Sequence, residues 1–170
     1  MSSATAQGAR EARVIVSSTS AAAGTAADRT GPSIVQWLSD RGFSTPPAAV
    51  VADGDPVGAA VRAAIDSEVA IVLTTGGTGI SPTDNTPEQV GPLLEVQLPG
   101  LIESLRARGA AVTPNAALTR GVAGFAGETF IMTLPGSPGG VRDGLAVLAE
   151  VLEHMLGQRS GTPRGQHSAR

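Results

Sequence analysis

The longest of the segments that could do chemistry is residues 74–87, which read TTGGTGISPTDNTP and follow an expected strand. Glycines let a backbone turn sharply and approach a ligand, and successive amides in such a turn can bind anions. The glycines are Gly76, Gly77 and Gly79, the hydroxyls are those of Thr75, Thr78, Ser81 and Thr83, and the carboxylate is Asp84. The spacing fits neither the GxGxxG fingerprint nor the lysine-bearing P-loop. The segment favours phosphate binding; the alternative is a turn that only connects two elements.

A second segment places Asp53 and Asp55 directly after another expected strand. Two carboxylates at the ligand-side edge of a parallel sheet are suited to Mg²⁺, which prefers oxygen ligands and sites shared with substrate phosphates. The alternative is an Asp-Gly-Asp-Pro turn in which Asp55 caps the helix behind Pro56.

A third segment, residues 134–143, reads LPGSPGGVRD and joins an expected strand to an expected helix. Helix N-termini bind anions through free amides and the helix dipole. The alternative is a plain strand-to-helix connection, with Arg142 and Asp143 as an ion pair in the first turn.

The composition limits the chemistry that these segments can support. Among 170 residues there is no Cys, all 12 basic residues are Arg, and the two His are His154 and His167. Thiolate nucleophiles, Schiff-base lysines and multi-histidine metal sites are therefore excluded or improbable. A net charge of -3 with 2% aromatic residues argues against a nucleic-acid partner. No apolar run reaches the roughly 20 residues of a membrane helix, and no secretory signal is visible, so we expect a cytoplasmic protein.

Apolar runs alternate with helices that open on Pro, which predicts a single three-layer α/β/α Rossmann-like domain with a mostly parallel sheet. The expected strands are residues 13–18, 48–52, 69–75 and 129–134. The expected helices are residues 32–41, 56–67, 99–108 and 141–156, with one more beginning near Thr86. Residues 21–31 are expected to form a loop. Ligands in such folds lie beyond the carboxyl ends of the strands, where all three segments fall.

Both ends of the chain are polar. We expect residues 1–11 to be a disordered lead-in, residues 12–157 to form the domain, and residues 158–170 to be a disordered tail. A segment with no large apolar side chain cannot offset its ordering entropy by burial. Truncation after Gln158 is therefore predicted to change neither melting temperature nor turnover. The competing idea is that Arg159, Arg164 and Arg170 fold over a phosphate site.

The three segments together resemble a known family. TTGGTG with the later Asp-x-Thr-Pro, the Pro99-Gly100-x-x-Glu103 pattern and LPGSP are similar to the molybdenum cofactor biosynthesis MoaB/Mog family, the molybdopterin adenylyltransferases. The resemblance covers residues 13–156. Gly24, Asp28 and the step from Gly31-Pro32 to Trp37-Leu38 also match.

The resemblance implies an activity: ATP and molybdopterin give adenylylated molybdopterin and pyrophosphate, with Mg²⁺. It also implies a homotrimer, and a downstream molybdenum-insertion protein as a possible partner. Asp53 and Asp84 are then the expected catalytic and metal-binding residues. The residues expected to bind substrate or nucleotide are Thr75, Gly76, Gly77, Thr78, Gly79, Ser81, Glu103, Pro135, Gly136, Ser137 and Pro138.

The sequence departs from the family pattern at two places. Many relatives carry Ser-Asp-Arg after the first strand, where this chain has Ser18, Thr19 and Ser20, and many carry Arg where Thr83 stands. Both changes remove positive charge from a site that handles phosphates. The candidates to replace that charge are Arg29, Arg106 and Arg120. Two other functions stay open: a non-catalytic molybdopterin-binding or carrier protein, and a nucleotide hydrolase on the same fold.

Overall fold

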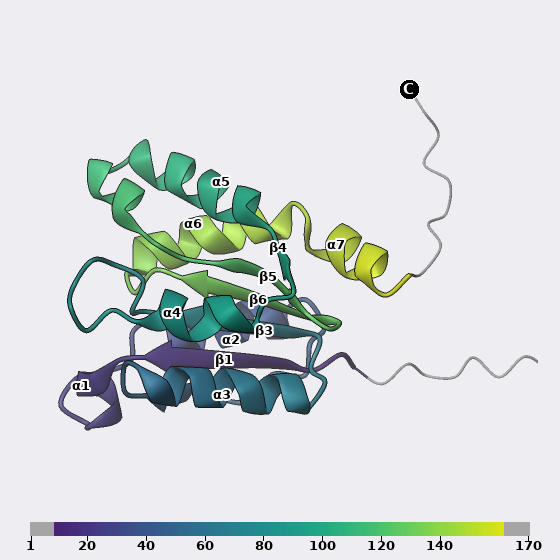
Figure 1. Ribbon diagram of the computed structural model, residues 1–170, viewed down its shortest axis with the longest axis horizontal. Coiled ribbons are helices and arrows are strands. Elements are labelled where there is room, and N and C mark those ends of the chain that lie inside the picture. The colour runs from purple at the N-terminus through teal and green to yellow at the C-terminus, as the bar shows by residue number, and fades with distance from the viewer. Residues whose placement is uncertain (1–8, 162–170) are drawn as a thin grey trace, which may run out of the picture.

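A six-stranded sheet forms the centre of the computed structural model, which describes residues 9–161 (Figure 1). The strand order is β2-β1-β3-β6-β5-β4. The first four strands in this order are parallel, and the last two are antiparallel to their neighbours. The strands are β1 (Ala12–Ser17), β2 (Ala49–Val51), β3 (Ile71–Thr75), β4 (Val96–Gln97), β5 (Ala123–Ala126) and β6 (Thr129–Leu134).

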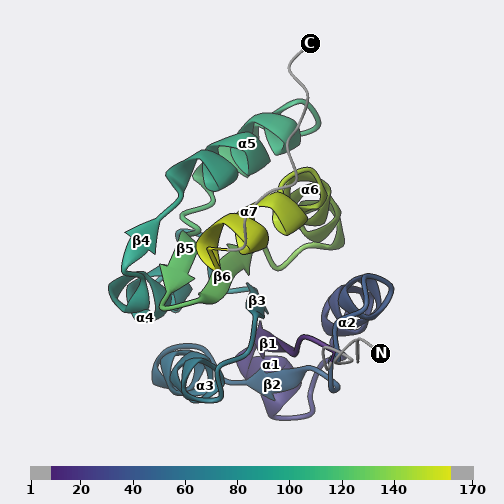
Figure 2. The ribbon, with the colours of Figure 1, turned by 90° about the vertical axis from the view of Figure 1, so that its right-hand side faces the viewer.

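Helices cover both faces of the sheet (Figure 2). One apolar core joins the sheet to α2 (Gly31–Ser39), α5 (Pro99–Ala110), α6 (Pro138–Ala149) and α7 (Leu152–Arg159). The other core joins the opposite face to α3 (Asp55–Asp66) and α4 (Thr86–Val90). The short elements α1 (Thr19–Ala22), η1 (Gly91–Leu93) and η2 (Pro114–Leu118) lie in connections. The predicted three-layer α/β fold is confirmed.

The two central strands explain why the sequence pattern was informative. Every residue of β3 and of β6 is buried, as expected where both faces of a parallel sheet are covered. Their runs of apolar and Thr residues therefore lack the polar alternation of a half-exposed strand. The antiparallel strands β4 and β5 were not predicted, because β4 is a two-residue exposed edge and β5 consists mostly of Ala and Gly.

The expected helix over residues 141–156 is in fact two helices. α6 ends at Ala149 and α7 begins at Leu152, so the backbone breaks between them. Leu145, Leu148, Leu152 and Leu156 are all buried in one core. The leucine spacing indicates a continuous buried face. Two helices packed on one sheet can share such a face, so the spacing does not indicate the break.

The ends of the domain extend further than predicted. Arg10, assigned to the lead-in, pairs with Glu153 at 2.8 Å, and Glu11 forms a β-bridge with Ser44. At the other end, α7 continues through Arg159, so the predicted tail boundary after residue 157 is wrong by at least two residues. The rest of the predicted lead-in and tail, residues 1–8 and 162–170, lies outside the described residues. Within residues 9–161 no helix is long and apolar enough to cross a membrane.

Candidate functional site

The segments singled out from the sequence meet at the carboxyl end of the parallel strands. The amide of Gly76 donates to the carbonyl of Leu134 at 3.1 Å, and the Thr75 hydroxyl donates to the carbonyl of Pro135 at 2.7 Å. These bonds hold the glycine loop after β3 against the loop after β6, because β3 and β6 are neighbours in the sheet. Fixed backbone amides at such an edge are suited to phosphate groups.

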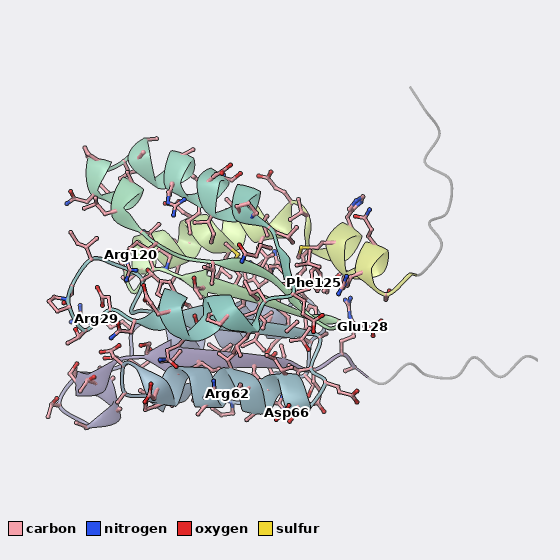
Figure 3. All side chains as sticks on the ribbon, viewed as in Figure 1. Arg29, Arg62, Asp66, Arg120, Phe125 and Glu128 are labelled. Carbon is pink, nitrogen blue, oxygen red and sulfur yellow. The ribbon has the colours of Figure 1, made fainter. Side chains whose placement is uncertain are left out.

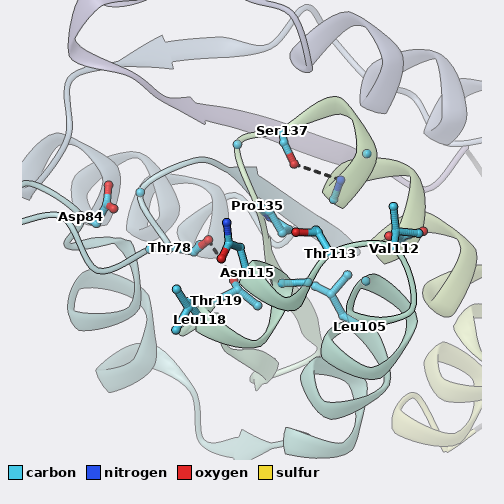
Figure 4. Close-up of a pocket in the computed structure, with 18 residues that line it drawn as sticks. Thr78, Asp84, Leu105, Val112, Thr113, Asn115, Leu118, Thr119, Pro135 and Ser137 are labelled. Atoms are coloured by element: carbon cyan, nitrogen blue, oxygen red, sulfur yellow. Dashed lines mark hydrogen bonds between the residues drawn. The ribbon is translucent and has the colours of Figure 1, made fainter.

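Two pockets open beside the glycine loop. The first, called here the apolar pocket, encloses about 500 Å³ between the glycine loop, α5, η2 and the start of α6 (Figure 4). The second, the hydroxyl pocket, encloses about 710 Å³ between the glycine loop, the segment after β1 and Asp53. Gly77, Asp84 and Gly136 line both pockets. A ligand that fills both would therefore pass Asp84.

Non-polar side chains dominate the outer wall of the apolar pocket. Leu105 comes from α5, Leu118 from η2, and Val112 from the turn between them. Val112 and Leu118 are exposed, at 85% and 49%. Sequence reasoning missed this wall, because its residues follow no strand and carry no chemical motif. An apolar wall opposite a row of backbone amides suits a flat ring that carries a phosphate.

Hydroxyl groups hold Asp53 in the other pocket. The Ser17 hydroxyl donates to Oδ1 of Asp53 at 2.5 Å, and the Thr19 hydroxyl donates to Oδ2 at 3.0 Å. Ser17 ends β1 and is buried, whereas Thr19 opens α1 and is exposed. Thr19 thus helps to orient Asp53, the catalytic candidate. Asp55 points elsewhere: it accepts a bond from Gln89 at 3.1 Å. Gly54, and not Asp55, is the N-cap of α3.

The glycine loop needs its glycines. Gly76 and Gly77 have φ values of +92° and +68°, a region that residues with a Cβ rarely adopt. A Cβ on Gly76 would collide with the carbonyl oxygen of Ser17, and one on Gly77 with the hydroxyl of Thr86. The loop is therefore pressed against β1 and α4, which brings its amides to the boundary between the pockets.

Asp84 forms two hydrogen bonds with Ser81 within the glycine loop. The amide of Ser81 donates to Oδ2 of Asp84 at 3.1 Å, and the amide of Asp84 donates to the carbonyl of Ser81 at 2.9 Å. Ser81 itself lines neither pocket, so its role is to orient Asp84. The half-buried Asp84 lines both pockets.

Arg120 fastens the same loop from the other end. Its Nε donates to the carbonyl of Gly79 at 2.8 Å and its second guanidinium nitrogen donates to the carbonyl of Asp84 at 2.7 Å. A third nitrogen pairs with Glu88. Figure 3 shows Arg120 at this end of the molecule. Arg120 was a candidate for phosphate binding, and the structure places its donors on the protein instead. Nothing in the sequence indicates that Arg120 would bond Asp84, which lies 36 positions earlier in the chain.

The pair with Arg120 changes the acidity of Glu88. Its hydrogen bond with the Arg120 guanidinium is the main cause that lowers the pKa of Glu88 below its ordinary value, and desolvation opposes this shift. The Glu88 side chain is 53% exposed, so solvent screens the interaction.

The start of α6 has the geometry expected from the third segment, with one correction. Ser137 caps the helix, because its hydroxyl accepts the amide of Gly140 at 3.1 Å. Gly136 and Ser137 line the apolar pocket. Asp143 does not pair with Arg142 as the alternative interpretation expected; its ion pair is with Arg108 on α5, at 3.7 Å.

Most of the predicted site residues come together, and three, Ser81, Glu103 and Pro138, line neither pocket. Around one or both pockets lie Asp53, Thr75, Gly76, Gly77, Thr78, Gly79, Asp84, Pro135, Gly136 and Ser137. Glu103 lies on the exposed side of α5 and lines neither pocket. Pro138 opens α6 and is exposed, next to residues that do line the apolar pocket.

The donor set at Asp53 and Asp84 fits one kind of metal site. Residues 9–161 contain no group of three His, Cys, Asp or Glu that could hold a metal ion. Mg²⁺ needs fewer protein ligands, since one or two carboxylates usually hold it together with water and substrate phosphates. Both aspartates line the hydroxyl pocket, so a magnesium ion shared with a phosphate ligand fits there.

Comparison with known proteins agrees with this fold. A family model described as a probable molybdopterin binding domain matches residues 13–154. The chain therefore belongs to the MoaB/Mog family of molybdenum cofactor biosynthesis proteins.

Individual relatives support the same assignment. A molybdenum cofactor biosynthesis bifunctional protein from Synechococcus elongatus is 39% identical over 91% of this chain and 49% of its own length. The chain thus spans about half the length of that relative. The Mog protein from Mycobacterium ulcerans is 52% identical with a TM-score of 0.86, covering 89% of this chain and 99% of the other. The MoaB protein from Pyrococcus furiosus, described as tungsten cofactor synthesizing, is 32% identical with a TM-score of 0.81, covering 89% and 97%.

Proposed function

We propose that this protein is a molybdopterin adenylyltransferase, which transfers AMP from ATP to the phosphate of molybdopterin. The observation that carries the proposal is the pair of pockets that share Gly77, Asp84 and Gly136. The apolar pocket suits the pterin ring, and the hydroxyl pocket suits the nucleotide phosphates. The reacting groups then meet at the glycine loop between them.

Adenylyl transfer between these substrates requires no protein nucleophile. A phosphate oxygen of molybdopterin attacks the α-phosphorus of ATP, a new oxygen–phosphorus bond forms, and the bond to the β-phosphate breaks. Pyrophosphate leaves with the electron pair of that bond. Catalysis of this kind consists mainly of positioning and charge stabilisation, so a chain without Lys or Cys can carry it out.

Each part of the site has a task in this reaction. The loop amides from Gly77 to Gly79 hold phosphate oxygens, and Ser137 caps the start of α6 beside them. Asp53, oriented by Ser17 and Thr19, and Asp84, oriented by Ser81, would hold Mg²⁺. When bound, Mg²⁺ neutralises charge on the phosphates. We propose that the product passes to a molybdenum-insertion protein in the cytoplasm.

A non-catalytic molybdopterin carrier is the second candidate. It is favoured by the residues that stand where many relatives have charged ones, namely Thr19, Ser20 and Thr83. Thr19 weakens this alternative in part, because its hydroxyl bonds Asp53 and so keeps that carboxylate in place.

Pyrophosphate release separates the two candidates. Purified protein is incubated with molybdopterin, ATP and Mg²⁺, and pyrophosphate is measured together with the adenylylated product. Multiple turnovers support the transferase. Binding of molybdopterin without pyrophosphate supports the carrier. Turnover of ATP in the absence of molybdopterin would instead indicate a nucleotide hydrolase.

A further inference from the structure

We infer that Arg29 is the residue that binds a substrate phosphate in the hydroxyl pocket. The inference deepens the proposed function and rests on it for the identity of the substrates. It concerns how a site lined by several carboxylates can hold anionic ligands.

The charges around the pockets require a cation. Asp28, Asp53 and Asp84 line the hydroxyl pocket, and Asp143 lines the apolar pocket. Arg29 is the one basic residue among the described residues that line either pocket. A phosphate ligand beside several carboxylates is repelled unless positive charge is present. An Arg guanidinium can bind two phosphate oxygens at once, which makes Arg well suited to supply that charge.

The other two candidates for this charge line neither pocket. Arg120 donates to two loop carbonyls and pairs with Glu88. Arg106 donates from Nε to the carbonyl of Thr119 at 2.8 Å and lines neither pocket. Among residues 9–161, by contrast, the Arg29 guanidinium makes no ion pair or hydrogen bond and is exposed.

The backbone on which Arg29 sits is fixed on both sides. Oδ1 of Asp28 accepts the amides of Thr30 and Gly31 at 3.0 and 2.9 Å, which anchors the chain at the start of α2. The Thr30 hydroxyl is buried and lies 3.3 Å from the Thr75 hydroxyl at the end of β3. Arg29 therefore extends from a fixed stretch of backbone next to the glycine loop. It lies at the end of the molecule where Figure 3 also places Arg120. A backbone that is already fixed does not have to be ordered when Arg29 binds a ligand.

The test compares two arginines that differ in place but match in charge and exposure. Arg62 is exposed on α3, lines neither pocket, and has no ion pair or hydrogen bond within the described part of the chain (Figure 3). Arg29→Gln and Arg62→Gln each remove one positive charge. Calorimetric titration with ATP in the presence of Mg²⁺, and with pyrophosphate, gives the dissociation constants, and melting temperatures verify folding.

We expect Arg29→Gln to raise the Kd for ATP or pyrophosphate, or the KM for molybdopterin, at least tenfold, with partial rescue by Arg29→Lys. Arg62→Gln should leave these three constants unchanged.

The pattern of increases says which phosphate Arg29 binds. An increase confined to molybdopterin assigns Arg29 to the pterin phosphate, and an increase for ATP and pyrophosphate assigns it to the nucleotide. Arg29→Gln values within twofold of wild type for all ligands overturn the inference, as does a wild-type protein that binds none of them. A wild-type protein that binds ATP but releases no pyrophosphate refutes the proposed function and leaves the role of Arg29 intact.

Discussion

Asp84 stands at the boundary between the two pockets, and its charge can be removed with little change of shape. The Ser81 amide donates to the Asp84 side chain, and Arg120 donates to the Asp84 carbonyl. Asn has the same backbone carbonyl and a side-chain oxygen that accepts, so Asp84→Asn should keep the loop conformation. We expect pyrophosphate release to fall at least about a hundredfold, because a magnesium ligand is lost. Activity and melting temperature are measured on the same sample.

Asp53→Asn should behave similarly, and Asp55→Asn is the matched control. Asp55 follows the same strand two positions later, yet it bonds Gln89 and lines neither pocket. Asp55→Asn should therefore keep wild-type turnover. Near wild-type rates for Asp84→Asn would show that the assignment of this carboxylate is wrong.

Glu88 provides a pH prediction at the same scale. Because Arg120 lowers the pKa of Glu88 in the folded protein, the ion pair stabilises the fold above the ordinary pKa of Glu, about 4.3. That contribution is lost as pH falls through the lowered value. For this exposed pair we expect Glu88→Gln to reduce the free energy of unfolding by no more than about 1 kcal/mol at pH 7.

Denaturant unfolding of wild type and Glu88→Gln at pH 7 and at pH 3 checks this prediction. The difference between the two proteins should be present at pH 7 and smaller at pH 3. An equal difference at both values would mean that the charge of Glu88 is not the cause.

At the scale of elements, the glycine loop depends on close contact with the end of β1. Gly76→Ala combines a φ of +92° with a collision at the Ser17 carbonyl, so we expect a loss of roughly 2 kcal/mol or more in the free energy of unfolding. Gly157→Ala is the control, since Gly157 lies within α7 and a Cβ there meets nothing within 4 Å. That change should stabilise by up to about 1 kcal/mol.

Thermal unfolding of both variants measures these effects. A neutral Gly76→Ala would show that the loop can retreat from β1. A destabilising Gly157→Ala would show that α7 does not continue past Leu156 in solution.

At the scale of the whole molecule, the helix α7 contacts the end of the sheet opposite the pockets through Arg159. Nε of Arg159 donates to the carbonyl of Gly127 at 2.9 Å, and its guanidinium lies 5.4 Å from the ring centre of Phe125. The prediction that truncation after Gln158 is harmless is thereby corrected. We now expect that truncation to lower the melting temperature by a few degrees relative to truncation after Gly161.

Turnover should be the same in the two truncated proteins. Arg159 contacts the turn between β5 and β6, at the end of the strands opposite the pockets, so it does not supply charge to the phosphate site. Arg164 and Arg170 lie outside the described residues. A higher KM for ATP after loss of Arg159 would contradict this separation.

Assembly is the second prediction at this scale. Within residues 9–161, Ile80 and Val96 are large apolar residues that are exposed and line neither pocket. Together with the family resemblance, they favour a closed homotrimer. Sedimentation at micromolar concentration should give a species of three times the chain mass of 16.9 kDa. A lone species at 16.9 kDa would contradict it.

Local patterns were sufficient for the four parallel strands, for most of the helices and for most of the candidate site. The buried runs of β3 and β6, the Pro residues that open helices, and the glycines before Asp84 each express a requirement that neighbours in the chain impose. Those requirements are set by backbone conformation and burial, so they are legible in a short window of sequence. The LPGSP loop was predictable for the same reason.

Contacts between distant segments were decided only by the tertiary structure. The apolar wall from Val112 to Leu118 belongs to the site because α5 and η2 pack beside the glycine loop. Glu103 leaves the site because its helix turns that position outward. Of three candidate arginines, Arg120 binds loop carbonyls and Arg29 keeps its guanidinium free among the described residues. A sequence gives the charged groups and hydroxyls that a chain contains. Their partners depend on how elements far apart in the chain pack together, and this packing is set only in the folded structure.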